Sequence, residues 1–232
     1  MAGTDIKIAS SEGGEFDSYL ALPASGSGPG VVLVAAVFGV DADQRKITDD
    51  LAAQGFCATS PDFFWRGDKG PLTRSEEDGK RARARAQPRQ ELIERGVQDL
   101  ADAVADLKAR PECNGRIAVA GFCYGGPYAL IGPARLGLDA GFSYHGTNLQ
   151  DWYGELDDVS APVALFWGTE DHAAPPEVLE KFKVGADTYG SLELHIYPGV
   201  GHGYTAQSAP AWDADAAKHS WTRTYEILNT LR

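Results

Sequence analysis

The segment RIAVAGFCYGGPYALIG, residues 116–132, decides the fold. It begins as a short β-rich run that ends in GFCYG, residues 121–125, and a helical pattern follows. A strand, a glycine-flanked turn and a helix in this order form the pattern of a nucleophile elbow, here with cysteine in place of serine. Glycines on both sides remove the Cβ clashes that would prevent the strained backbone of such a turn. The pattern predicts Cys123 as a nucleophile; the alternative is a small buried cysteine in a glycine-rich turn.

The helix that follows the turn adds to this interpretation. Pro127 is compatible with a first helical turn, where no intrahelical N–H bond is lost. The positive end of the helix would then point at Cys123 and favour its thiolate form.

Two later segments bring an acid and a histidine to the ends of strands. The run PVALFWGTED, residues 162–171, leads from a strand into a loop that ends on Asp171, and His202 stands between glycines after another strand. Nucleophile, acid and histidine in this chain order are typical of enzymes with such an elbow. His202 is expected to hold the proton of the cysteine, and Asp171 to fix its tautomer. The alternatives are that Asp171 caps the next helix, that Glu170 is the acid, and that His202 is an ordinary loop residue.

The other four histidines fit a catalytic role less well. His195 lies within a strand pattern and His219 within the closing helix, so both are expected to be structural or exposed. His172 neighbours the acid and His145 follows a strand, where it could line a pocket. Neither is expected to be catalytic.

Short β-rich runs alternate with helical stretches along the whole chain, which predicts a mainly parallel, doubly wound sheet with helices on both faces. Its 232 residues fit one α/β domain, 1–232. The expected strands are 15–23 (as a half-buried edge strand), 31–37, 55–60, 116–120, 138–144, 162–167 and 192–197. The expected helices are 41–54, 88–110, one from 177 and 213–231, with a polar surface excursion over 62–87.

Composition limits the partners. The formal net charge is −12, which argues against nucleic acid and anionic membranes because both require a basic footprint. The chain starts without a signal-peptide pattern, and its longest apolar run is too short to span a bilayer. Three cysteines without metal-type spacing predict a reduced, cytoplasmic protein with no metal and no cofactor. A monomer or homodimer that acts on a small molecule is expected.

At this point the chain resembles the dienelactone hydrolase family, the cysteine-nucleophile members of the α/β-hydrolase fold. The resemblance covers nearly the whole length and rests on five segments. These are VFGV (37–40), PDFFWR (61–66), GFCYGG (121–126), Asp171-His172 and Gly201-His202. It implies a single α/β-hydrolase domain that cleaves a small ester or lactone through a thioester. It also implies an oxyanion hole made by the backbone N–H groups of Val37 and Tyr124.

Three positions depart from the family pattern. The best-studied members carry a glutamate where this chain has Ala36, and that glutamate is thought to keep the resting cysteine away from its histidine. They hold the substrate carboxylate with two arginines; Arg81 matches one of them, and Ala206 stands in the place of the other. Gly203 replaces the usual serine. We therefore expect a thiolate–imidazolium pair at rest and weaker recognition of a substrate carboxylate.

Further residues are candidates for the substrate pocket. Arg81 belongs to the basic stretch 80–85, in which Arg83 and Arg85 are better interpreted as a solvated helix face. Aromatic residues that flank the motifs are expected to wall an apolar pocket, although aromatics near strand ends are often simply core. They are Phe38, Trp65, Tyr124, Tyr144 and Tyr204.

Two other functions remain open from the sequence. One is a general carboxylesterase with an unrelated substrate. The other is a non-catalytic ligand-binding or redox-sensing protein on a hydrolase scaffold, with Cys123 as its reactive thiol. The complete set of Cys123, His202 and Asp171 favours an enzyme.

Overall fold

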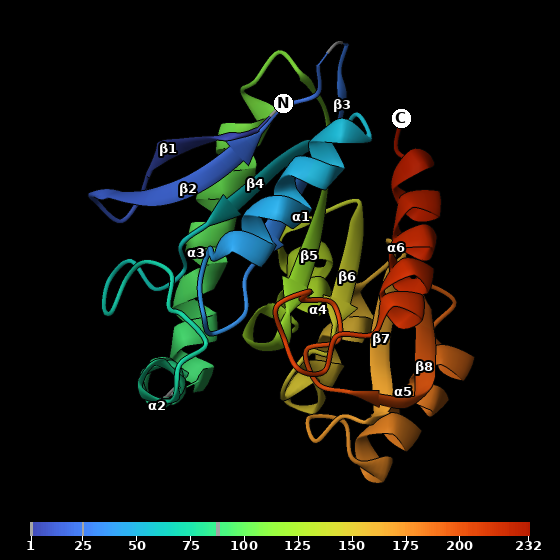
Figure 1. Cartoon of the computed structure of the whole chain (residues 1–232). Helices are drawn as coiled ribbons and strands as arrows, with labels where there is room; N and C mark the ends of the chain where they lie inside the picture. The colour runs from blue at the N-terminus through green and yellow to red at the C-terminus, as the bar shows by residue number, and fades with distance from the viewer. Residues whose placement is uncertain (1, 25, 87–88) are drawn as a thin grey trace. The chain divides into compact units, whose positions relative to one another are not determined.

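The computed structural model describes residues 2–24, 26–86 and 89–232. Contacts within the chain define two compact units, one of residues Met1–Ile117 with Arg232 and the other of residues Ala118–Leu231. The elements of both are labelled in Figure 1. No helix within the described ranges is long and apolar enough to cross a membrane.

Among its described residues, the first unit contains four complete strands in the order β1-β2-β4-β3. They are β1 (Thr4–Ala9), β2 (Glu15–Ala21), β3 (Gly28–Val34) and β4 (Cys57–Pro61). β3 and β4 are parallel, whereas β2 is antiparallel to both β1 and β4. The predicted strand at 15–23 is thus real, but its assignment as an edge strand was wrong because β1 covers its free side. The mostly exposed, polar sequence of β1 gave no strand signal strong enough to predict it.

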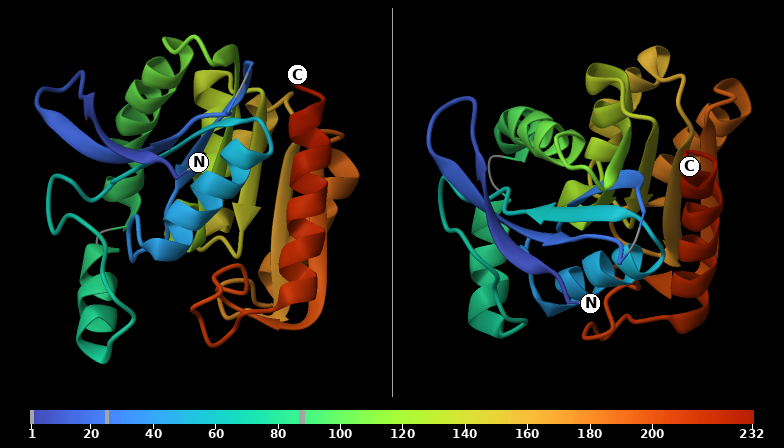
Figure 2. Two further views of the ribbon diagram at one scale, coloured as in Figure 1. Left: turned by 45° about the horizontal axis from the view of Figure 1, so that its top comes forward. Right: turned by 90° about the horizontal axis from the view of Figure 1, so that it is seen from above.

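The helices described in the first unit are α1 (Ala42–Ala53), α2 (Glu76–Arg85) and α3 (Arg89–Lys108). α1 begins where the Asp41 side chain accepts a hydrogen bond from the Gln44 backbone N–H at 2.9 Å, the usual N-cap interaction. α1 and α3 lie on opposite faces of the four strands (Figure 2). The expected helices at 41–54 and 88–110 are confirmed within a residue or two, except that Pro88 lies outside the described residues. The expected surface excursion contains α2.

The second unit takes up the chain within β5 (Cys113–Phe122) and continues with β6 (Ala140–Tyr144), β7 (Val163–Glu170) and β8 (Leu192–Gly201). These strands are neighbours in that order, and each adjacent pair is parallel. All of β6 and the first six residues of β7 are buried, as expected of parallel strands covered on both faces. Because the strands are parallel, their carboxyl ends meet at one edge, where the candidate site lies.

The connections of this unit are two 3₁₀ segments and three α-helices. They are η1 (Cys123–Gly125), α4 (Tyr128–Leu136), η2 (Leu149–Asp158), α5 (Pro176–Thr188) and α6 (Ala214–Asn229). In Figure 1, α6 lies in front of β6 to β8. The sequence did not predict η2, whose polar, irregular turns have no helical periodicity.

Candidate active site

Cys123 stands directly at the end of β5 and has a left-handed backbone conformation with φ of 51°. Its carbonyl accepts hydrogen bonds from the backbone N–H groups of Gly126 and Thr147, each at 3.0 Å, which hold the turn. A Cβ on Gly121 would lie 1.9 Å from the Gly125 carbonyl oxygen. The turn is therefore possible only with glycine at 121, and it holds the half-buried Cys123 side chain in a strained position.

Pairing between β7 and β8 brings the acid and the histidine together. Glu170 is the register partner of Gly201, so the next residues on the two chains, Asp171 and His202, lie side by side. Nδ1 of His202 lies 2.8 Å from Oδ1 of Asp171, within hydrogen-bonding distance. The Asp171 oxygen also accepts the Ala173 backbone N–H at 2.8 Å. The Asp171 side chain is fully buried and that of His202 is 20% exposed, which leaves the imidazole accessible from one side.

The electrostatics of His202 join the third residue to this pair. Burial disfavours its charged form, but hydrogen bonds to Asp171 and to Cys123, and the charges of both, raise the pKa of His202 to about 10. A histidine that hydrogen-bonds a thiol on one side and a buried carboxylate on the other is able to exchange a proton with the sulfur while keeping a fixed orientation.

Two further histidines contact the ring of His202. The His145 ring centroid lies 4.8 Å away in an edge-on arrangement, and the His172 centroid lies 4.7 Å away on another side. His145 is buried, with φ of 41°, and its Nε2 lies 3.0 Å from Oγ1 of Thr205. Neither histidine was expected to be catalytic. A signal was nevertheless present, because His145 follows the last residue of β6 and His172 comes two residues after the end of β7.

Three residues that were predicted to belong to the site, Phe38, Trp65 and Val37, lie in the first unit. The Arg74 guanidinium lies 4.6 Å above the half-buried Phe38 ring. Trp65 stacks on Phe16 at 5.8 Å and donates its indole N–H to Asp99 at 3.1 Å. Val37 follows β3, and its carbonyl accepts a hydrogen bond from Arg85 at 3.3 Å.

The remaining candidates of the second unit are tyrosines that are fully buried. The hydroxyl of Tyr144 lies 2.6 Å from that of Thr224, and its ring stacks on Phe122 at 4.8 Å. The Tyr204 ring lies 5.7 Å from that of His145. Tyr124 is buried within η1. These surroundings are those of core residues around the site, and a direct role in substrate binding stays a prediction.

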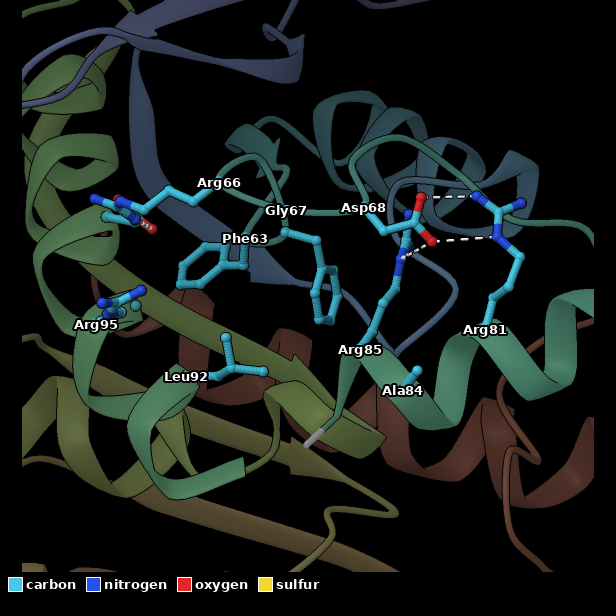
Figure 3. Close-up of a pocket in the computed structure, with 12 residues that line it drawn as sticks. Phe63, Arg66, Gly67, Asp68, Arg81, Ala84, Arg85, Leu92 and Arg95 are labelled. Carbon is cyan, nitrogen blue, oxygen red and sulfur yellow. Dashed lines mark hydrogen bonds and ion pairs between the residues drawn. The ribbon is translucent and has the colours of Figure 1, made fainter. Parts of the chain in front are cut away.

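A cavity of about 340 Å³ opens in the first unit between the 63–68 loop, α2 and α3. Figure 3 shows Arg81 and Arg85 pointing toward Asp68 within it. Two Arg81–Asp68 hydrogen bonds, at 2.7 and 3.2 Å, form a bidentate pair, and Arg85 Nε lies 3.7 Å from the same carboxylate. Arg66 likewise pairs with Asp99 at 2.7 Å, so the basic lining is largely compensated by acids.

Arg85 corrects one expectation. Its side chain is only 2% exposed and donates to the carbonyls of Val37 and Gly70, and burial lowers its pKa. The interpretation as a solvated helix face was wrong for this residue, because the 63–70 loop folds over α2. The Arg83 side chain lies outside the described part of the chain.

Known proteins are similar to this chain in sequence and in architecture. The carboxymethylenebutenolidase 1 of Cupriavidus pinatubonensis (strain JMP 134 / LMG 1197) is 32% identical over 232 residues, which cover 100% of this chain and 99% of that protein. The carboxymethylenebutenolidase of Pseudomonas sp. (strain P51) is 30% identical, with 100% and 97% covered. Among solved structures, the Pyrococcus furiosus esterase Pf2001 superposes with a TM-score of 0.71 at 18% identity, covering 98% of this chain and 90% of that one.

A dienelactone hydrolase-like promiscuous phosphotriesterase from metagenomic libraries superposes more closely, with a TM-score of 0.80 at 23% identity and with 100% and 99% of the two chains covered. The fold and the relatives together define the chain as an α/β-hydrolase-fold enzyme, a carboxylic ester hydrolase, which confirms the predicted fold class. Residues 16–232 match the dienelactone hydrolase family, and the chain belongs to that family.

Proposed function

We propose that this enzyme hydrolyses a small carboxylic ester or lactone through a thioester on Cys123, with His202 as acid and base and Asp171 as the residue that orients His202. One observation carries the proposal. Cys123 stands in a left-handed turn at the end of β5 and hydrogen-bonds a histidine whose other ring nitrogen lies 2.8 Å from a fully buried carboxylate.

In the first half of the reaction, the Cys123 thiolate attacks the carbonyl carbon of the substrate and a carbon–sulfur bond forms. The tetrahedral intermediate collapses with cleavage of the carbon–oxygen bond, and His202 in its imidazolium form donates its proton to the departing alkoxide. With a lactone the alcohol and the acyl group remain one molecule, so the ring opens while the acyl end stays attached to sulfur.

In the second half, water attacks the thioester carbonyl while neutral His202 accepts its proton. Collapse of this intermediate breaks the carbon–sulfur bond, releases the carboxylic acid and restores the thiolate–imidazolium pair. Asp171 keeps Nε2 of His202 directed at the reacting atoms in both steps by holding Nδ1. The oxyanion is expected to be stabilised by the backbone N–H groups of Val37 and Tyr124, a part of the proposal that rests on the family resemblance.

The substrate class follows from the named relatives, which are carboxymethylenebutenolidases. We propose that this chain acts on the same kind of bond, in a lactone or an ester, with a looser demand for a carboxylate on the substrate. Ala206 stands where the family pattern has a second arginine, and Arg81 is paired with Asp68 and Asp78.

The direct test is to trap the acyl-enzyme. The protein is mixed with p-nitrophenyl acetate, quenched with acid within milliseconds to seconds, digested and examined by mass spectrometry. We expect one acetyl group, on the peptide that carries Cys123, and its disappearance as the substrate is exhausted. Rapid turnover without an acyl group on Cys123 at any quench time would contradict the thioester pathway. Stoichiometric acylation without turnover would favour a non-catalytic thiol instead.

A further inference from the structure

We propose that Asp171, His172 and His202 form a binding site for Zn²⁺ and that zinc bound at this site inhibits the enzyme. The site uses the proposed catalytic pair of His202 and Asp171 and adds His172, which the proposed hydrolytic reaction does not use. The inhibitory consequence rests on the proposed function, whereas the binding site itself does not.

The three side chains have the geometry of a nearly formed metal site. One potential ligand atom from each of them lies within 4.8 Å of the other two. Nδ1 of His202 is 2.8 Å and Nδ1 of His172 is 4.0 Å from Oδ1 of Asp171. Ligands of a tetrahedral zinc ion lie ~2.0–2.2 Å from the metal, and therefore somewhat more than 3 Å from one another. The Asp171–His202 pair needs to open slightly, and His172 needs to move inward.

His172 is free to make that movement. Its side chain is 79% exposed, so rotation about its own bonds brings the ring nitrogen nearer without disturbing the core. The backbone on both sides of His172 is held in place. Before it, the chain leaves strand β7 at Glu170, and after it, the Ala173 N–H donates a hydrogen bond to the Asp171 side chain. The exposed ring therefore closes over a site whose other two ligands are already held in place.

The buried carboxylate supplies a second, independent observation. Asp171 uses Oδ1 for both His202 and Ala173, whereas its Oδ2 is buried with no hydrogen-bond partner among the described residues. An ionised carboxylate whose second oxygen is unsatisfied is costly to bury, and a cation bound to this carboxylate would offset part of that cost. Two imidazoles and one carboxylate, with a position left for water, are a common ligand set for zinc. The net charge of −12 also favours the approach of a cation.

Zinc at this site prevents the proton transfers of the reaction. Coordination through Nδ1 of His202 displaces the proton that is shared with Asp171, and that proton is released to the solvent. His202 then carries its remaining proton on Nε2, so it has no lone pair with which to accept a proton from water in the second half of the reaction. We therefore expect a reversible inhibitor site that differs from simple capture of zinc by the Cys123 thiolate.

The first experiment measures binding and does not depend on turnover. The full chain is titrated with Zn²⁺ against a chromogenic chelator at fixed pH. We expect one ion per chain in the wild type and an affinity at least about tenfold lower in His172→Ala, within the range that ligand-shell substitutions cause. His219→Ala is the matched control, because it removes a histidine of α6 that contacts Tyr197 rather than the site, and its affinity should equal that of the wild type.

A second pair of measurements separates the site from the nucleophile. Cys123→Ser should bind Zn²⁺ within about threefold of the wild type, since the sulfur is not a ligand. Zn²⁺ should abolish p-nitrophenyl acetate hydrolysis by the wild type reversibly, with EDTA restoring it, and at least about tenfold more zinc should be needed for His172→Ala.

The proposal is overturned if zinc does not bind, if His172→Ala binds and is inhibited like the wild type, or if Cys123→Ser loses binding. If the wild type binds zinc as expected but hydrolyses no ester, the proposed function fails while the metal site stands.

Discussion

At the scale of single residues, the proposed mechanism depends on the protonation state of His202. Its Nδ1 lies beside the buried carboxylate of Asp171, and its ring also hydrogen-bonds Cys123, the thiol with which it is proposed to exchange a proton. Both partners favour the imidazolium form more than burial opposes it, and the pKa of His202 is raised to about 10. The proton that His202 is proposed to give to the leaving group is therefore present at neutral pH.

The raised pKa of His202 determines the direction in which activity should change with pH. Because the imidazolium form persists up to a pH of about 10, kcat/KM should be retained through neutral pH and fall as the pH rises through that value. Asp171→Asn removes a charge that raises this pKa, so its alkaline limb should move to lower pH and its maximum rate should drop. The measurement is p-nitrophenyl acetate turnover against pH, with Asp157→Asn on the surface as control. An alkaline limb at the same pH in wild type and Asp171→Asn would contradict this role.

The absence of a carboxylate at position 36 leads to a second prediction at this scale. With Ala36 in place of the family's glutamate, nothing from that position competes with His202 for the proton of Cys123. We expect iodoacetamide to label Cys123 rapidly at neutral pH, with a labelling midpoint well below that of free cysteine. Peptide mapping after labelling from pH 5 to 9 measures this.

Cys57 is an internal control for that experiment. Burial, together with the nearby Cys113, raises the pKa of Cys57 to about 12, so it should stay unlabelled across the whole range. A labelling midpoint for Cys123 at the value of free cysteine would mean that the resting thiol is neutral.

At the scale of elements, the turn between β5 and η1 is the part with the least freedom. Gly121→Ala places a methyl group 1.9 Å from a backbone carbonyl, and neither side can move without opening the elbow. We expect a loss of at least ~1–3 kcal/mol in the free energy of unfolding, the usual cost of overpacking, and loss of ester turnover. Urea denaturation measures the stability.

Gly154→Ala is the matched control for the turn. An added Cβ at Gly154, within η2, meets no atom within 4 Å, so its stability should stay within about 0.5 kcal/mol of the wild type. Equal stability and activity of the two variants would show that the elbow tolerates a side chain at 121.

At this scale, the sequence predicts features that depend on neighbouring residues and misses features that depend on distant segments. The elbow, the helix at 41–54 and the buried parallel strands are encoded in consecutive residues, and the structure has them within a few residues of where they were expected. The place of β2 inside the sheet depends on a polar partner strand that is distant from any motif. Burial of Arg85 depends on a loop that folds back over α2, which residue patterns do not encode.

The candidate site shows the same division. Chain order and strand ends were enough to propose Cys123, His202 and Asp171 as candidates, and their catalytic roles stay a prediction. The contacts of His145 and His172 with His202 arise from three different strand ends that converge in space, and only the structure shows which side chains meet there.

At the scale of the whole molecule, charge bears on which substrates the enzyme accepts. The chain carries a net charge of −12, Ala206 replaces one expected arginine, and Arg81 is paired with acids. A lost charge-assisted contact is worth ~1.5–3 kcal/mol, roughly tenfold to a hundredfold in kcat/KM. We expect a neutral aryl ester to be hydrolysed within about tenfold of its analogue with a free carboxylate, such as an aryl succinate half-ester.

Arg81→Ala tests this expectation and should change the ratio between the two substrates by less than about tenfold. Arg95→Ala, an exposed arginine that lines the same cavity, serves as the control. A strong preference of the wild type for the carboxylated ester that disappears in Arg81→Ala would instead show that Arg81 leaves its acidic partners and binds the substrate.

Of the three cysteines, only Cys123 is proposed as the nucleophile. Cys57 begins β4 in a buried position and Cys113 begins β5, and neither stands in a positive-φ turn or hydrogen-bonds a histidine in the described structure. The most direct measurement is p-nitrophenyl acetate turnover by Cys123→Ala, Cys57→Ala and Cys113→Ala, each verified as folded by circular dichroism. We expect the rate to fall at least about a thousandfold for Cys123→Ala and to stay nearly unchanged for the other two variants. Turnover by Cys123→Ala at the wild-type rate, or an equal loss of turnover in all three folded variants, would contradict the assignment of Cys123 as the nucleophile.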